Sequence, residues 1–399
     1  MPLTTSRNAV AVVFACNGVL FATLLARVPD VREGLDLDNG SLGLLLLAIA
    51  GGSLIALPSA GRLVQRWGAA AVVRTGAGLC VAGLAGVGVA VLESVGSVAG
   101  AAVALFVYGV GTGVWDVAMN VEGAEVERRL ARTVMPRFHA GWSLGSVAGA
   151  GAGIAATAAD VPMALHVGVL ALLGAGATVV AVPRFLPTQP PAGGGRSAGT
   201  SAWTEPRTLL IGVLVLTFAL AEGTANDWIA LAVIDGHDTA QWVGVAAFTL
   251  FVASMTTGRL VGPVFLDRHG RSPVLWVASV MVAAGALLTV FSGHALAIGV
   301  GVVAWGLGAS LGFPIGMSAA ADDPARAAAR VSVVSTIGYG GFLAGPPLVG
   351  HLGDRVGTLE ALLVVVALMV PAALTAAATR PSGQRRGETQ DQVVERPSS

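Results

Sequence analysis

Residues 61–68 read GRLVQRWG and stand between two long apolar stretches, at residues 40–60 and 71–92. Each stretch has about 20 residues, which is the length that an α-helix needs to cross the hydrocarbon core of a bilayer. The glycines at both ends of the segment permit a tight turn, and arginines are typical of the cytoplasmic surface of a membrane. The segment therefore predicts a short cytoplasmic turn between two membrane-spanning helices.

The same alternation of apolar stretches and short polar connections continues along all 399 residues. Charged residues make up 12% of the chain and hydrophobic residues 54%, whereas soluble domains carry about 25% charged residues. The composition predicts an all-α membrane protein with twelve membrane-spanning helices, surrounded by a lipid bilayer. The predicted spans lie near residues 8–28, 40–60, 71–92, 97–121, 138–158, 162–183, 207–233, 241–262, 273–292, 295–318, 331–350 and 357–378.

Charge is distributed unevenly across this predicted membrane. With the N-terminus inside, the cytoplasmic connections contain most of the 23 cationic residues, all arginine, and the outer connections keep little beyond Arg32 and Arg355. Cytoplasmic loops of membrane proteins carry an excess of arginine and lysine, so both termini are expected inside (N-in/C-in). The formal net charge is zero, which gives no reason to expect a nucleic acid partner. Cys16 and Cys80 fall in apolar spans and predict neither a disulfide nor a metal site.

Three pairs of glycines recur with one shared separation of 197 residues, which indicates a duplicated six-helix unit. The pairs are Gly61 and Gly258, Gly109 and Gly306, and Gly141 and Gly338. A stretch rich in Pro and Gly between the two units predicts a linker. The expected division is 1–183 for the first six-helix half, 184–206 for the linker, 207–378 for the second half and 379–399 for a disordered cytoplasmic tail. Duplicated halves are an architecture of alternating-access transporters.

The segment 61–68 resembles the signature loop of the major facilitator superfamily, in which a glycine is followed four residues later by an acidic residue and then by an arginine and a second glycine; Gln65 stands at the acidic position here. In that family the loop helps to latch the outward-facing state. The resemblance and the internal repeat together imply a conformational latch. Its expected members are Gly61, Arg62, Arg66, Gly68, Gly258 and Arg259. A generic basic cytoplasmic turn is the alternative interpretation.

Residues 109–120, GVGTGVWDVAMN, place a carboxylate inside the fourth predicted span. Asp116 and Asn120 are four residues apart and therefore share one face of a helix. A charged side chain at the bilayer centre costs at least about 2.5 kcal/mol, so this face should line the interior. The stretch resembles the fucose and hexose permeases of the superfamily, which implies that Asp116 carries the coupling proton and that Asn120 supplies a polar contact. A purely structural Asp116, hydrogen-bonded to a neighbouring helix, is the alternative.

Further candidates for a substrate and proton pathway come from the first, fifth and eleventh predicted spans. His139 and Trp142 are three residues apart on one side of the fifth span, although a tryptophan there could instead anchor the helix at the membrane interface. Tyr339 takes the place of Trp142 in the second half. Asn17 is included because it belongs to a set of stretches, at 17–18, 26–29, 116–120 and 227–228, that resembles bacterial inner-membrane facilitator proteins of unassigned substrate.

The seventh predicted span contributes two more candidates. Glu222 and Asn226 are four residues apart and lie on one helix face. Glu222 is near the middle of its span, where an ionisable residue is by default a functional candidate. Both residues are therefore assigned to the expected substrate and proton pathway.

These features predict a secondary active transporter that moves a small polar solute by alternating access, driven by protons through Asp116 or Glu222. A drug or metabolite efflux antiporter of the same superfamily is the close alternative, and a polytopic membrane enzyme or sensor is a remote one. The sequence holds no nucleotide-binding motif, evident nucleophile or metal cluster, so neither an enzyme activity nor a cofactor is expected. The arginine-only cations and the excess of Ala, Gly and Val favour a bacterial cytoplasmic membrane, and the chain is expected to function as a monomer.

Overall fold

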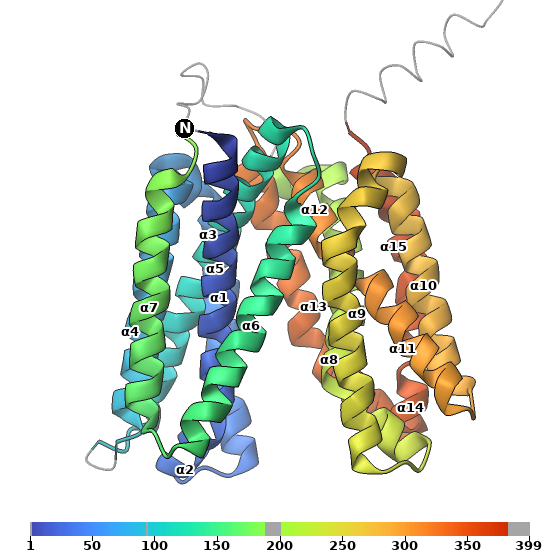
Figure 1. Ribbon diagram of the computed structural model, residues 1–399, viewed down its shortest axis with the longest axis horizontal. Coiled ribbons are helices and arrows are strands. Elements are labelled where there is room, and N and C mark those ends of the chain that lie inside the picture. The colour runs from blue at the N-terminus through green and yellow to red at the C-terminus, as the bar shows by residue number, and fades with distance from the viewer. Residues whose placement is uncertain (1, 93–94, 188–200, 382–399) are drawn as a thin grey trace, which may run out of the picture. The chain divides into compact units, whose positions relative to one another are not determined.

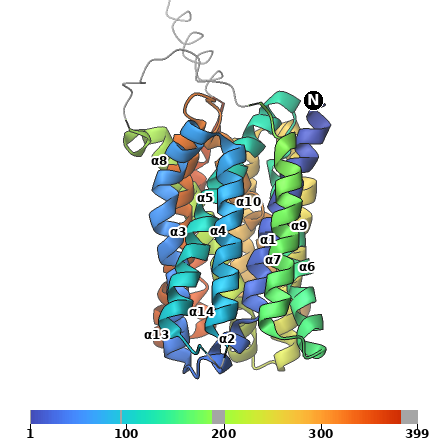
Figure 2. The ribbon, with the colours of Figure 1, turned by 90° about the vertical axis from the view of Figure 1, so that its left-hand side faces the viewer.

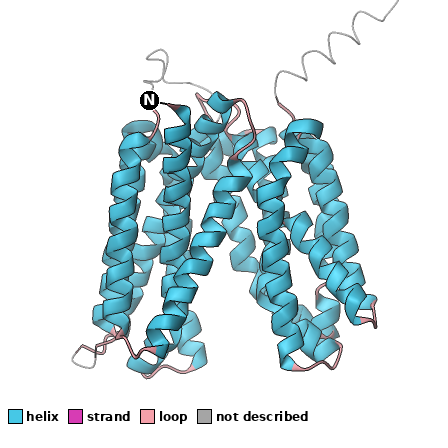
Figure 3. Cartoon of the chain, viewed as in Figure 1, coloured by secondary structure: helices cyan, strands magenta, loops and turns pink. Residues whose placement is uncertain are grey.

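The computed structural model describes residues 2–92, 95–187 and 201–381, and every regular element in these ranges is a helix (Figure 3). The chain forms two compact units. Unit 1 comprises Met1–Ala198 and Ala328–Thr336, and unit 2 comprises Gly199–Ala327 and Ile337–Ser399. Most of the predicted linker and tail, residues 188–200 and 382–399, lies outside the described residues.

Unit 1 is a bundle built around two groups of helices (Figure 1). The long helix α5 packs against α3 and α4, and α1 packs against α6 and α7; α1 and α7 lie side by side in Figure 2. The bounds are α1 Leu3–Ala26, α2 Val28–Gly34, α3 Asn39–Trp67, α4 Ala69–Ala90, α5 Val98–Leu130, α6 Met135–Ala158, α7 Met163–Ala181 and the 3-10 helix η1 Val182–Arg184.

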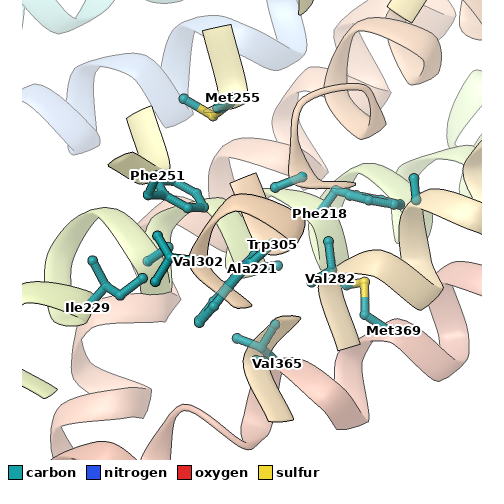
Figure 4. Packing of buried hydrophobic residues seen from close by; sticks show 14 of the residues in the cluster. Phe218, Ala221, Ile229, Phe251, Met255, Val282, Val302, Trp305, Val365 and Met369 are labelled. Carbon is teal, nitrogen blue, oxygen red and sulfur yellow. The ribbon is translucent and has the colours of Figure 1, made fainter. Parts of the chain in front are cut away.

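Unit 2 has an apolar centre to which α8, α9, α10, α11 and α15 contribute (Figure 4). Phe218, Ile229, Phe251, Val282 and Trp305 are all buried there. Because lipid tails are themselves apolar, close van der Waals packing stabilises such helix contacts in a membrane. The bounds are η2 Ala202–Thr204, α8 Pro206–Gly236, α9 Gln241–His269, α10 Arg271–Phe291, α11 Ala295–Ala309, α12 Gly312–Ala320, α13 Ala327–Val356, α14 Thr358–Ala361, α15 Val364–Thr375 and η3 Ala376–Thr379.

Eleven helical segments of the described chain are long and apolar enough to cross a membrane. The predicted span at 138–158 falls on α6, which is not among them, because α6 combines small Gly, Ala and Ser residues with Arg137 and His139. Large apolar side chains such as Leu44, Leu172 and Leu374 are exposed on the helices, as expected for surfaces that face lipid.

The structure differs from the sequence prediction where helices end. The predicted turn at 61–68 is helical as far as Trp67, and only Gly68 turns, with φ of 80°. Gly270 ends α9 in the same way, with φ of 78°. Both positions need a left-handed backbone that glycine adopts without steric cost. Hydropathy alone missed the added helical turns because the polar ends of a span can remain helical outside the apolar core.

Candidate functional site

The centre of α5 carries two buried polar side chains that contact each other. The Asn120 Nδ2 group donates to the Asp116 backbone oxygen at 2.9 Å and lies 3.2 Å from Asp116 Oδ1. Residues four apart meet on one face of a helix, which is the spacing on which the prediction of a shared face depended. The structure therefore brings these two predicted site residues into one hydrogen-bonded pair.

Side chains from two other segments of unit 1 extend this pair. His139 Nε2 from α6 lies 3.2 Å from Asn120 Oδ1. The hydroxyl of Ser335, in the part of α13 that belongs to unit 1, donates to Asp116 Oδ2 at 3.2 Å. We call these four side chains the Asp116 network. The sequence prediction missed Ser335, because a single serine in a span gives no signal of the partner that it meets.

Glycines allow α3 to approach the same helix closely. A methyl group at Gly109 would lie 2.8 Å from the Ile49 carbonyl carbon, and one at Gly113 would lie 3.1 Å from the Ser53 carbonyl oxygen. The Ser53 hydroxyl also donates to the Gly109 carbonyl at 2.9 Å. Close approach of this kind fixes the rotation of α5 about its own axis, and so fixes the direction of Asp116.

A second polar contact joins α1 and α6. The Trp142 indole N–H donates to Asn17 Oδ1 at 2.9 Å, and the Phe21 ring lies 5.5 Å from the Trp142 ring. Because an indole N–H can only donate, the oxygen of the Asn17 amide must face it, and the amide nitrogen points elsewhere. The Asn17 amide nitrogen is not among the buried side-chain atoms of the described chain that lack a hydrogen-bond partner. We call Asn17, Phe21 and Trp142 the amide–aromatic patch.

In unit 2, Glu222 of α8 forms a buried ion pair with Arg259 of α9. The Arg259 Nη2 atom lies 3.0 Å from Glu222 Oε1 and 3.1 Å from Oε2, and both residues are buried. The sequence prediction had assigned Glu222 to the pathway and Arg259 to the latch. The structure joins them in one pair.

The same arginine lies at a break between two helices. The predicted span 295–318 is divided into α11 and α12 at Ser310 and Leu311. Pro314 has no N–H, so it cannot donate to the carbonyl of Ser310 four residues earlier. The Arg259 Nε group donates to that carbonyl at 3.4 Å. Arg259 therefore contacts both a buried carboxylate and a carbonyl that proline has released from the helix.

Two predicted pathway residues of unit 2 stand apart from this pair. Asn226 lies one turn after Glu222 on α8; it is half-buried, and its side chain forms no hydrogen bond to another described group. Tyr339 is half-buried on α13 and packs edge-on against Phe342, with 6.3 Å between the ring centroids.

The six predicted latch residues do not form one cluster. Arg62 and Arg66 are exposed on α3, while Arg259 is buried. Gly61 packs against the first turns of α13: a methyl group there would lie 2.9 Å from both the Ala328 carbonyl carbon and Ser332 Cβ. Gly258 packs against Ser310, whose Cβ would be 2.8 Å from such a methyl group. The glycines of the repeat thus mark close helix contacts, and the arginines differ between the halves.

We expect Gly61→Leu to destabilise unit 1 by about 1–3 kcal/mol, because the added side chain has no space beside α13. Gly78→Leu is the matched control, since no described atom lies within 4 Å of a methyl group at that exposed position of α4. Thermal unfolding of the purified variants measures the difference. Equal melting temperatures would contradict the tight contact at Gly61.

Buried carboxylates at one end of α5 were also missed by sequence reasoning. Glu122 Oε1 accepts the backbone N–H of Leu186 at 2.7 Å. Glu127 Oε2 accepts the N–H groups of Val134 and Met135, at 2.8 and 2.7 Å. Glu127 thereby satisfies donors at the start of α6. The described residues contain no group of three or more His, Cys, Asp or Glu side chains that could hold a metal ion.

Known proteins resemble this chain along almost its whole length. A family model described as Major Facilitator Superfamily matches residues 228–398. An uncharacterized MFS-type transporter of Yersinia pestis is 33% identical over 377 residues, 92% of each chain. The uncharacterized transporter y4wD of Sinorhizobium fredii is 32% identical over 377 residues, 92% of this chain and 98% of its own. The crystal structure of the MFS transporter FucP in the outward conformation shares the fold, with a TM-score of 0.78, 16% identity and coverage of 94% and 98%.

Proposed function

The chain belongs to the major facilitator superfamily, and from this premise we propose that it is a secondary active transporter of a small polar solute, coupled to protons. The observation that carries the proposal is the Asp116 network. A carboxylate within a membrane helix is costly, and buried Asp116 accepts hydrogen bonds from Asn120 on its own helix and from Ser335 on α13. A carboxylate held in this way can gain and lose a proton without leaving its place.

The amide–aromatic patch supports a polar solute as the cargo. Its ring faces can contact an apolar face of a solute, and the Asn17 amide nitrogen can donate to an oxygen on it. Binding sites for small molecules commonly combine apolar and aromatic walls with a few placed polar groups.

Glu222 and Arg259 are proposed to keep a buried charge pair in unit 2, beside the break between α11 and α12.

The decisive experiment is transport by purified protein in proteoliposomes under an imposed pH gradient. The solutes are labelled sugars, organic acids and cationic drugs. We expect at least one polar solute to accumulate only while the gradient persists. Accumulation in the direction of proton flow indicates symport, and expulsion of a drug or metabolite against it indicates the efflux alternative. Uptake that is unchanged after the gradient is collapsed would refute proton coupling.

For topology, we propose twelve crossings, with α6 as the crossing of lowest hydropathy, and both termini on the cytoplasmic side of a bacterial membrane. A cysteine at Arg132, in the connection between α5 and α6, should then react with an impermeant maleimide only from inside. A cysteine at Asp238, between α8 and α9, should react only from outside. Both positions are exposed. Labelling of the two cysteines from the same side would overturn this orientation. We also propose that one subunit transports by itself.

A further inference from the structure

We infer that His139 is a second proton-binding group of this transporter and that Asn120 couples it to Asp116, so that the two groups titrate together. The physiological meaning of this inference rests on the proposed proton-coupled transport. The coupling itself is a property of the protein alone and can be measured without knowing the solute.

The direction of each hydrogen bond follows from the Asn120 amide. Its NH2 group donates to Asp116, both to the backbone oxygen at 2.9 Å and to Oδ1 at 3.2 Å. Its oxygen therefore faces His139 Nε2, 3.2 Å away. An amide oxygen can only accept, so His139 must carry a proton on Nε2 in this arrangement.

The arrangement links the charges of the two titratable groups. A negative charge on Asp116 polarises the Asn120 amide and makes its oxygen a stronger acceptor, which favours a positively charged imidazole. Asp116, Asn120 and His139 are only 5%, 0% and 8% exposed, and hydrogen-bonded groups shielded from water polarise one another more strongly. Charge on either group thus favours charge on the other, and loss of one weakens the other.

Neighbouring groups of the network come from several helices, and exposed Arg137 on α6 is the charged residue nearest to His139 along the chain. From α13, Ser335 bonds to Asp116 and half-buried Arg330 lies more than one turn earlier. From α1, Phe14 meets the His139 ring edge-on at 5.1 Å.

Other neighbours of α5 and α6 have partners away from the network. On α4, Cys80 lies 3.7 Å from Thr112 Oγ1, and on α3, Ser53 bonds to Gly109. The α5 carboxylates Glu122 and Glu127 accept backbone N–H groups.

The test is a histidine titration by NMR of full-length protein in nanodiscs, with 15N-labelled histidine and the proton as the probe. The His139 signals are identified as those lost in His139→Gln. We expect neutral His139 to carry its proton on Nε2. We also expect Asp116→Asn to lower the proton affinity of His139 about tenfold. In an Asn120→Leu background the same substitution should change that affinity by less than about threefold. His237, which contacts the Thr289 carbonyl in unit 2, is the control and should not respond.

Equal effects of Asp116→Asn with and without the Asn120 amide would overturn the inference, as would a His139 that does not titrate. If Asn120→Leu does not fold, Asn120→Ser provides the same comparison with a shorter polar side chain. Failure here can be distinguished from failure of the proposed function. Intact proton-driven uptake with no coupling at His139 refutes only this inference, whereas coupling at His139 without proton-driven uptake refutes the transport proposal.

Discussion

Asp116→Asn is expected to abolish accumulation of the solute against its gradient while leaving counterflow exchange. A coupling carboxylate must change protonation during the cycle, and asparagine keeps nearly the same shape but is permanently neutral. Exchange needs no net proton movement. It should fall by less than about tenfold, because replacing a charge-assisted hydrogen bond by a neutral one costs about 1 kcal/mol.

The measurement compares pH-driven uptake with exchange in the same proteoliposomes. Asp227→Asn is the matched control, since Asp227 is an exposed carboxylate on α8 and should leave both activities unchanged. Continued concentration of the solute by Asp116→Asn would show that another group carries the proton. Loss of both activities together with poor folding would show that Asp116 has a structural role.

The sequence predicted the contacts within one helix better than the contacts between helices. The four-residue spacing of Asp116 and Asn120 placed them on one face, and the structure joins them. The partner of Asn120 depends on how α6 is rotated against α5, and the partner of Asp116 depends on where α13 passes. Close contacts such as Gly145 against Ala15, between α6 and α1, and Gly61 against Ala328, between α3 and α13, help to set this geometry, and hydropathy does not encode them.

The pairing of Glu222 with Arg259 was not predicted from the sequence. The shared separation of 197 residues made Arg259 the counterpart of Arg62, so both were assigned to the conformational latch. Arg259 is buried, ten residues before the end of α9. Arg259 also lies inside a predicted span, 241–262, so the argument used for Glu222, that an ionisable residue within a span is by default a functional candidate, applies equally to Arg259.

The largest expected effect on stability belongs to this ion pair. Arg259→Met removes the cation and leaves Glu222 buried without its charge partner, and it also removes the donor to the Ser310 carbonyl. Breaking a buried pair in this way costs about 3–5 kcal/mol. The free energy of unfolding, measured by denaturant titration in detergent, should fall by that amount. Arg62→Met, at the exposed counterpart, is the matched control and should change little.

The double variant Glu222→Leu with Arg259→Met separates stability from transport. Apolar residues of similar volume can replace a buried ion pair without loss of stability. The double variant should therefore unfold at a clearly higher denaturant concentration than Arg259→Met alone. A double variant as unstable as the single one would show that the Ser310 carbonyl, rather than Glu222, is the contact that matters. If stability returns and proton-driven uptake does not, the pair is part of the transport cycle, because packing alone no longer explains why α8 and α9 each keep a buried charge.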